Sequence, residues 1–240
     1  MSESPLYGKG CLITGATGGL GRELAKAFGQ AGCRLFLTSR REGELQALKS
    51  TLAQSTGGQV LYRAVDLADP AQVEDLVLAV QAEWGTLGLL VNSAGVFPVG
   101  PLLEAPIGAY EACFNLNVRA PLLLCRAFGA GMIQAGWGRI INIASSSAYA
   151  GFPGSSLYCA SKHALLGLSR ALHAEWKVSG VRVFCVSPGS IDTAMARVSV
   201  DQDPSTFLDP AEVARFIVDL VSYDGAMVAE EVRLNRMVLR

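Results

Sequence analysis

The chain has 240 residues, of which 50% are hydrophobic and 17% charged, and its formal net charge is −1 at pH 7. This balance provides no basic excess for a nucleic-acid or anionic-membrane partner, and no apolar run approaches the roughly eighteen residues of a membrane span. Residues 1–5 lack the features of a secretory signal, and the six cysteines form no Cys-x-x-Cys pair. We therefore expect a cytoplasmic chain without a metal site, and its apolar content favours a homo-oligomer.

The first apolar run, residues 10–14, leads into the glycine-rich segment Thr14-Gly15-Ala16-Thr17-Gly18-Gly19-Leu20-Gly21. Helical periodicity follows over residues 22–31. A strand, a glycine-rich loop and a helix in this order are typical of dinucleotide binding, because glycines let the backbone approach a pyrophosphate and the helix N-terminus offers free N–H groups. A glycine-rich turn without a ligand is the weaker alternative.

The next predicted strand ends at Ser39 and is followed by Arg40 and Arg41. In a dinucleotide fold the residue at this position faces the adenosine ribose, where an acid would accept from the 2′-hydroxyl. A serine followed by two guanidinium groups suits a 2′-phosphate instead, so we predict NADP(H) rather than NAD(H). Two solvated arginines at a helix start are the alternative, and Arg22 is a second candidate contact that could equally face solvent.

Two strand ends farther along the chain carry further candidates. Asp66 follows the third predicted strand, where its side chain could meet the adenine amino group, whereas Asp69 before Pro70 is typical of a helix cap. The fourth strand ends in residues 92–95, Asn-Ser-Ala-Gly, whose small side chains allow a ligand to approach closely.

A long helical pattern over residues 107–131 carries Asn115 and Asn117. A buried asparagine within a helix usually needs a hydrogen-bond partner, so one of these two is a functional candidate. Near the C-terminal end, residues 194–209 are irregular and polar and form a candidate substrate lid.

The segment between Asn142 and Lys162 holds the strongest catalytic candidates. Tyr158 and Lys162 stand four residues apart at the start of a predicted helix, which puts a phenol and an ammonium on one helix face. Ser145 can reach the same place, because the end of the preceding strand faces the start of this helix. We interpret the three side chains as a proton-transfer site in which the ammonium lowers the Tyr158 pKa from its usual value of about 10. A half-buried tyrosine and a solvated lysine are the alternative.

Strands and helices alternate along the whole chain, without a repeat or a domain linker. This alternation predicts one α/β domain over residues 1–240, with a Rossmann-like, doubly wound, mainly parallel seven-stranded sheet flanked by helices on both faces. The strands are expected at 10–14, 34–39, 61–65, 87–91, 139–143, 181–186 and 232–235. The helices are expected at 22–31, 71–84, 107–131, 156–179 and 210–223.

Five motifs in register make the chain, from residue 6 to residue 235, resemble the classical short-chain dehydrogenase/reductase family. The glycine motif is matched by Thr14, Gly15, Gly19, Leu20 and Gly21, and the adenine-site acid by Asp66. The Asn-Asn-Ala-Gly motif is matched by Asn92, Ala94 and Gly95, with Ser93 as its one change. The catalytic group is matched by Ser145, Tyr158, Lys162 and Asn117. The nicotinamide-side motif is matched by Pro188, Gly189, Ile191 and Thr193.

The resemblance implies hydride transfer between a nicotinamide and a carbonyl carbon. Tyr158 would be the general acid in the reductive direction, and Ser145 would hold the substrate oxygen. Lys162 would lower the Tyr158 pKa and bond the nicotinamide ribose, and Asn117 would hold a water that links Lys162 to solvent. The family resemblance also implies a dimer or a tetramer.

The substrate stays open among a 3-oxoacyl thioester, a small ketone and a bulky carbonyl or the corresponding alcohol. Phe97, Tyr149, Phe152 and Met195 are expected to shape its pocket. One alternative function is a non-catalytic, cofactor-binding regulatory or scaffold protein on the same fold, which need not retain the catalytic group. Another is an NAD-dependent alcohol dehydrogenase, which the sequence 39–41 disfavours.

Overall fold

The computed structural model describes residues 4–198 and 202–236, in which seven strands form one sheet. Every pairing is parallel, and the order across the sheet is β3-β2-β1-β4-β5-β6-β7. The strands are β1 (Gly10–Thr14), β2 (Arg34–Ser39), β3 (Val60–Ala64), β4 (Leu89–Asn92), β5 (Gly138–Ile143), β6 (Val181–Pro188) and β7 (Glu231–Leu234). The predicted doubly wound sheet is confirmed.

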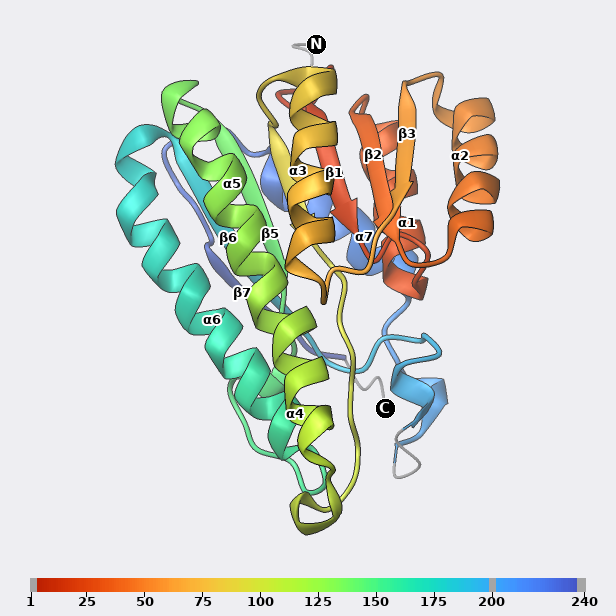
Figure 1. The fold of residues 1–240 in the computed structure, drawn as a ribbon. Coiled ribbons are helices and arrows are strands. Elements are labelled where there is room, and N and C mark those ends of the chain that lie inside the picture. Colours follow the sequence, from red (N-terminus) through yellow and green to blue (C-terminus); the bar gives the residue numbers. More distant parts are fainter. Residues whose placement is uncertain (1–3, 199–201, 237–240) are drawn as a thin grey trace.

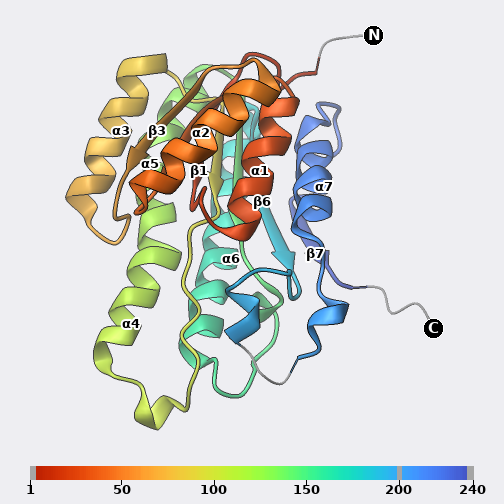
Figure 2. The same cartoon turned by 90° about the vertical axis from the view of Figure 1, so that its right-hand side faces the viewer.

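Helices cover both faces of this sheet (Figures 1 and 2). One face carries α1 (Gly19–Gln30), α2 (Glu42–Thr56) and α7 (Pro210–Ser222). The other carries α3 (Pro70–Trp84), α5 (Ala120–Gln134) and α6 (Ser156–Trp176), while α4 (Ile107–Phe114) precedes α5 and packs against α6. The apolar strands are buried between these layers, as expected for a parallel sheet whose crossover helices lie on both sides.

Helix α2 was not among the expected helices. Only Leu45, Leu48 and Leu52 are buried along it, so its apolar stripe is narrow and its periodicity is weak. The start of α3 was predicted correctly, because Pro70 begins the helix and the Asp69 carboxylate accepts a hydrogen bond from the N–H of Ala71 at 3.0 Å.

The helix expected over residues 107–131 is not continuous α-helix. Residues Asn115–Arg119 form one π-helical turn between α4 and α5. A π-turn adds a residue to the turn, which a 3.6-residue hydrophobic period does not reveal. The turn places Asn117 in the interior with 1% of its surface exposed, whereas Asn115 is half-buried.

The helical stretch Ile107–Gln134 is long and apolar enough to cross a membrane by length and composition alone, and 44% of its most apolar window is buried in the fold. Leu124, Phe128 and Met132 on this stretch pack into the core between the sheet and α3. These contacts are those of a core helix in an α/β fold.

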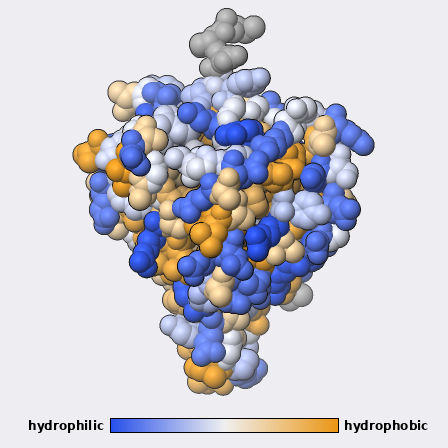
Figure 3. Space-filling model, turned by 45° about the horizontal axis from the view of Figure 1, so that its top comes forward, coloured by the Kyte–Doolittle hydropathy of each residue, from blue (hydrophilic) through white to orange (hydrophobic). Residues whose placement is uncertain are grey.

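The loop before α4 forms the narrow end of the molecule. Figure 3 shows hydrophobic side chains at this end, where Leu102, Leu103 and Ile107 are exposed. They form apolar surface outside the cores that pack against the sheet.

Candidate active site

A cavity of about 750 Å³ opens at the carboxyl ends of β1, β4, β5 and β6. Strands β1 and β4 are neighbours in the sheet although β2 and β3 lie between them in sequence, so the chain leaves this point in opposite directions. Ligands of open α/β sheets bind at such a switch point. The predicted site residues that line the cavity are Gly15, Gly19, Leu20, Gly21, Gly95, Ser145, Tyr158, Lys162, Pro188, Gly189, Ile191 and Thr193.

The remaining predicted residues, Thr14, Ser39, Arg40, Arg41, Asp66, Asn92, Ala94 and Asn117, do not form its wall. Two of them hold the wall in place. Thr14 Oγ1 accepts hydrogen bonds from the N–H groups of Ser93 and Ala94, both at 3.0 Å, and so fixes the glycine loop to the end of β4. Asn92 Nδ2 donates to Asn142 Oδ1 at 2.8 Å, which joins β4 to β5 inside the core.

The glycine loop has no room for a side chain at Gly15 or Gly21. A Cβ at Gly15, whose φ is +65°, would lie 2.8 Å from the Cα of Ala94, and a Cβ at Gly21 would lie 2.1 Å from the carbonyl oxygen of Gly15. Helix α1 begins directly behind this loop at Gly19, and its N-cap Gly18 makes no side-chain cap. The first N–H groups of α1 are therefore available to an anion, so this cradle fits the pyrophosphate of a dinucleotide.

Lys162 is a buried cation in the wall of the cavity. Its side chain is 4% exposed, and Nζ donates one hydrogen bond, at 2.8 Å, to the carbonyl oxygen of Ile143. Burial lowers the pKa of Lys162 from 10.5 to about 8. An ammonium has three N–H groups, so two are left without a partner among the described residues. Two free donors in a buried place fit the hydroxyls of a ribose.

Tyr158 behaves differently from the expectation. Burial raises its pKa to about 12, and the hydrogen bond from Ser145 opposes that shift only in part. Nζ of Lys162 lies 5.5 Å from the centroid of the Tyr158 ring. The predicted lowering of the pKa is therefore wrong for the protein alone, because burial governs the shift, and Tyr158 is a phenol at neutral pH.

Ser145 follows β5 and begins a short 3₁₀ turn, Ser146–Ala148. Its Oγ accepts a hydrogen bond from the N–H of Ser147 at 3.1 Å. The hydroxyl can still donate, because this bond uses only one of its acceptor positions. The loop thus brings Ser145 to Tyr158 across the cavity wall, as the spacing predicted.

Asn117 reaches the site from the π-turn. Its Oδ1 accepts from the N–H of Val96 at 2.9 Å, and its Nδ2 donates to the Val96 carbonyl at 3.0 Å and to Ser161 Oγ at 3.1 Å. A Cβ at Gly95 would lie 3.2 Å from Asn117 Oδ1 and 3.8 Å from Lys162 Nζ. The missing side chain of Gly95 thus leaves space between the amide and the ammonium.

The predicted adenosine-end residues form a separate polar group beside the glycine loop. One Nη of Arg41 donates to both the carbonyl oxygen and Oγ1 of Thr17 at 3.0 Å, and its other Nη lies 2.8 Å from Glu44 Oε1. Arg22 Nε also donates to the Thr17 carbonyl at 3.0 Å, and its Nη2 pairs with Glu44 Oε2. Arg40 is exposed.

Asp66 holds its own turn, with Oδ1 accepting from the N–H of Ala68 at 3.0 Å. Phe97, Phe152 and Met195 line the cavity as expected. Tyr149 does not, because its hydroxyl donates to Glu231 Oε2 at 3.0 Å instead.

The cavity wall also includes Gly18 and Ser93 of the predicted ligand-binding segments, and Ala194, Ala196 and Gln202 of the predicted lid. The structure adds wall residues that the sequence did not single out: Ile143, Ala144, Ser146, Ser147, Pro153, Ser155, Ser190, Asn235 and Arg236. Asn235 and Arg236 directly follow β7, so the rule that sites form at carboxyl ends of strands could have found them. Part of the expected lid is structured as two 3₁₀ turns, Ala196–Val198 and Pro204–Thr206. Residues 199–201 of the lid lie outside the described residues.

Within residues 4–198 and 202–236, no cluster of three or more His, Cys, Asp or Glu side chains could hold a metal ion.

A family model described as short chain dehydrogenase matches residues 9–204. D-threitol dehydrogenase of Mycolicibacterium smegmatis is 34% identical, with 93% of this chain and 89% of that protein covered.

Solved structures agree with this match. The L-sorbose reductase of Gluconobacter frateurii, complexed with NADPH and L-sorbose, is similar with a TM-score of 0.89 and 28% identity over 98% of both chains. A metagenomic short-chain oxidoreductase in complex with NADP is similar with a TM-score of 0.85 and 30% identity, over 97% of this chain and 99% of that one.

Proposed function

The chain belongs to the short-chain dehydrogenase/reductase family of oxidoreductases, and we propose that it reduces a carbonyl compound with NADPH, or oxidises the corresponding alcohol with NADP⁺. The observation that carries this proposal is the position of Ser145, Tyr158 and Lys162 in the wall of one cavity, which the glycine cradle also lines. A nicotinamide dinucleotide bound in this cavity would supply or accept the hydride.

The three side chains have distinct proposed roles. Tyr158, a phenol at neutral pH, gives its proton to the substrate oxygen in the reductive direction. Ser145 donates a hydrogen bond to the same oxygen and stabilises the negative charge that develops there. Lys162 uses its two remaining N–H groups to hold the ribose hydroxyls, and its positive charge favours the phenolate once the proton has left Tyr158.

Asn117 is proposed to position the site and to hold a relay water. Its amide fixes Val96 and Ser161 around Lys162. Oδ1 keeps a second lone pair, and the gap above Gly95 lies between that atom and Lys162 Nζ. A water in this gap would connect the ammonium to the cavity.

The preference for NADP(H) rests on Ser39 and the arginines that follow it. Ser39 carries no charge that would repel a 2′-phosphate, and Arg41 and Arg22 converge beside the glycine loop. The NADP-containing relatives support the same choice. We propose that the contacts to the cofactor also include Thr14, Gly15, Gly19, Leu20, Gly21, Arg40, Asp66, Asn92, Ala94, Gly95, Pro188, Gly189, Ile191 and Thr193.

We further propose a single cytoplasmic domain over residues 1–240, closed by the lid at 194–209 and assembled as a homodimer or homotetramer. The exposed apolar residues Leu102, Leu103 and Ile107 support an assembly. The substrate is a small ketone, a 3-oxoacyl thioester or another carbonyl compound. A monomer in light scattering would contradict the assembly.

The test is NADPH oxidation by the purified protein against a panel of carbonyls that includes an acetoacetyl thioester, L-sorbose and other ketoses. We expect turnover with at least one of them, and a loss of about 10²- to 10⁴-fold in Tyr158→Phe, because the variant keeps the ring but has no proton to give. Tyr149→Phe is the matched control, since its hydroxyl binds Glu231 outside the cavity wall.

The two alternatives predict other results. Tight NADPH binding without turnover of any carbonyl would favour the non-catalytic, regulatory function. Turnover with NADH at least as efficient as with NADPH would favour the NAD-dependent alcohol dehydrogenase. Full turnover by Tyr158→Phe would show that another group gives the proton.

A further inference from the structure

We propose that Glu44 limits the preference for NADP(H) over NAD(H), because its carboxylate occupies the anion position between Arg22 and Arg41 that a 2′-phosphate would take. This inference rests on the proposed use of a nicotinamide dinucleotide. It concerns a residue on α2, outside every motif that the sequence presented.

The carboxylate of Glu44 bridges the two arginines. One oxygen pairs with Arg22 Nη2 and the other lies 2.8 Å from Arg41 Nη1. Both guanidinium groups are also anchored to the carbonyl oxygen of Thr17, at 3.0 Å each. The N–H groups of both arginines that remain for an anion therefore face one position, and the Glu44 carboxylate occupies it.

This anion position adjoins the cavity. Thr17 lies between Gly15 and Gly18, which line the cavity wall, and the N–H of Arg41 donates to Ser39 Oγ at 3.2 Å. Ser39 ends β2, where a dinucleotide fold places the adenosine ribose. The bridged arginines are thus within the region that the ribose 2′-position would occupy.

A phosphate can displace this carboxylate. The side chains of Arg22 and Glu44 are 36% and 37% exposed, so their ion pair is partly solvated and weak. A phosphate monoester carries up to two negative charges and three acceptor oxygens, which suit two guanidinium groups better than one carboxylate does. Glu44 sits in the first turn of α2, where it can turn towards solvent and keep its favourable interaction with the helix N-terminus.

The displacement has a cost that falls on NADPH and not on NADH. A dinucleotide with a free 2′-hydroxyl can leave the bridge intact, whereas a 2′-phosphate must break two ion pairs and lies close to the displaced carboxylate. Glu44 therefore reduces the preference for NADPH that Arg22 and Arg41 alone would provide.

The test compares Glu44→Gln with Glu42→Gln, an exposed acid in the same first turn of α2. Dissociation constants for NADPH and NADH are measured by fluorescence, and those for 2′,5′-ADP and 5′-AMP by calorimetry. We expect Glu44→Gln to bind NADPH and 2′,5′-ADP about three- to tenfold more tightly, from the loss of two weak ion pairs. Binding of NADH and 5′-AMP should change by less than about twofold, and Glu42→Gln should resemble the wild type.

A double-mutant cycle locates the effect. In an Arg41→Gln background, Glu44→Gln should improve NADPH binding much less, because one half of the anion position is missing. Unchanged or weaker NADPH binding in Glu44→Gln would overturn the inference, as would an equal gain for NADH or for Glu42→Gln. In those cases the wild type still binds NADPH and the proposed function stands. If the wild type binds neither dinucleotide, both fail.

Discussion

Strand β5 has a buried cation beside each of its ends, and the two cations have different hydrogen-bond and ion-pair partners. At the amino end, Arg139 is 1% exposed, donates to the carbonyl oxygens of Gly138 and Gly180 at 2.9 and 3.3 Å, and pairs with Asp224. At the carboxyl end, Lys162 is 4% exposed, and its one acceptor within residues 4–198 and 202–236 is the carbonyl of the last strand residue, Ile143.

The pKa values follow from these surroundings. Burial lowers the pKa of Arg139 to about 10, the neighbouring Arg182 adds to that shift, and Asp224 opposes it. Burial lowers the pKa of Lys162 to about 8, and the groups that oppose this shift are the Cys185 and Cys113 thiols rather than a carboxylate of the described residues.

Arg139 has a carboxylate and two carbonyl oxygens as partners, although its buried Nε has none in the described part of the chain. Lys162 has a single carbonyl partner there and lies in the wall of the cavity. A buried cation in a cavity wall without a carboxylate partner is therefore typical of a ligand site, whereas one paired with a carboxylate away from the cavity is typical of a structural site.

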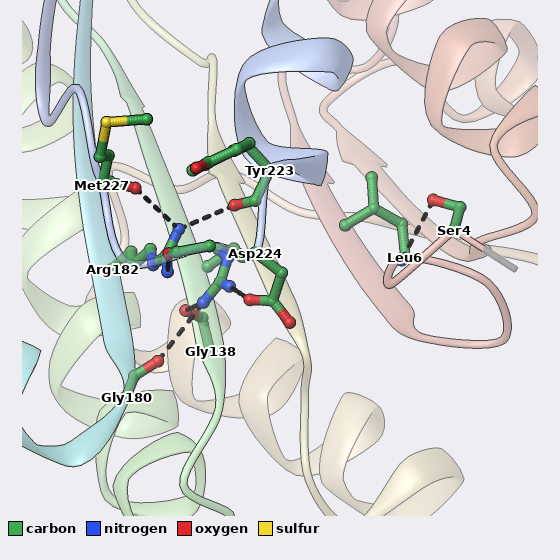
Figure 4. A network of polar contacts seen from close by, with 10 residues as sticks. Ser4, Leu6, Gly138, Gly180, Arg182, Tyr223, Asp224 and Met227 are labelled. Atoms are coloured by element: carbon green, nitrogen blue, oxygen red, sulfur yellow. Dashed lines mark hydrogen bonds and ion pairs between the residues drawn. The ribbon is translucent and has the colours of Figure 1, made fainter. Parts of the chain in front are cut away.

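Arg139 belongs to a larger structural group at the amino edge of the sheet. Figure 4 shows Arg182 donating to the carbonyl oxygens of Tyr223 and Met227, next to the guanidinium that pairs with Asp224. Two guanidinium groups from β5 and β6 thus hold the turn that connects α7 to β7. This turn has no part in the cavity wall.

The largest expected difference between Lys162 and Arg139 is in their effect on turnover. Lys162→Met should lower kcat by at least about 100-fold and weaken NADPH binding, because the ribose loses its donors and the phenolate loses its neighbouring charge. Its free energy of unfolding at pH 7 should be unchanged or higher, since methionine fills the space without burying a charge. Steady-state kinetics and urea unfolding measure the two properties.

Lys177→Met, at an exposed position after α6, is the matched control for this variant. It should leave both properties near wild type. A marked loss of stability in Lys162→Met, with kcat per folded molecule intact, would make Lys162 a structural cation and remove the contrast.

The second effect is the pH dependence of stability. Because the Lys162 pKa falls from 10.5 to about 8 on folding, both states are protonated below about pH 8, whereas above it only the unfolded chain keeps the proton. Wild type should therefore gain up to about 3 kcal/mol of stability relative to Lys162→Met as pH rises from about 8 to about 10.5.

Urea unfolding of both proteins across this pH range measures the difference. Burial raises the pKa values of the Cys11, Cys33 and Cys125 thiols, which has the opposite effect on stability, but both proteins share these cysteines. If the difference in unfolding free energy between wild type and Lys162→Met does not change with pH, burial does not lower the Lys162 pKa.

The third expected effect is the opposite of the first, because it falls on stability and not on turnover. Arg139→Met should lower the free energy of unfolding by about 2 kcal/mol, because the carbonyl oxygens of buried Gly138 and of Gly180 lose their donor, while kcat per folded molecule stays at the wild-type value. Arg126→Met, at an exposed position on α5, should change neither property. A loss of kcat in folded Arg139→Met would contradict this prediction and show that the two ends of β5 are coupled.

The smallest effect is expected from Asp224→Asn. The asparagine oxygen can still accept from Arg139, and Asp224 is 46% exposed, so the loss of unfolding free energy should be about 1 kcal/mol. A cost larger than that of Arg139→Met would mean that the arginine without its anion is worse than no arginine.

Most of the fold and the cavity wall could be predicted from the sequence, because they depend on local patterns. The apolar runs indicated all seven strands within one or two residues, and Asp69-Pro70 indicated the start of α3. The spacing of Ser145, Tyr158 and Lys162 indicated the cavity wall that they share.

What the sequence could not indicate depends on contacts between distant elements. The Tyr158 pKa is governed by burial, which no local pattern measures. Glu44 meets Arg22 across 22 residues of sequence and on a helix whose own periodicity is weak. Tyr149 stands near the catalytic residues in sequence, but its hydroxyl is taken by Glu231 on the last strand.

The central place of β1 has a consequence for synthesis on the ribosome. β1 pairs with β2 on one side and with β4 on the other, so a nascent chain leaves one edge of β1 open until residue 92 has emerged. The glycine loop is also not fixed until then, because Thr14 Oγ1 accepts hydrogen bonds from the N–H groups of Ser93 and Ala94. A nucleotide therefore has no complete cradle to bind until more than a third of the chain has been made, so it cannot guide the folding of that part.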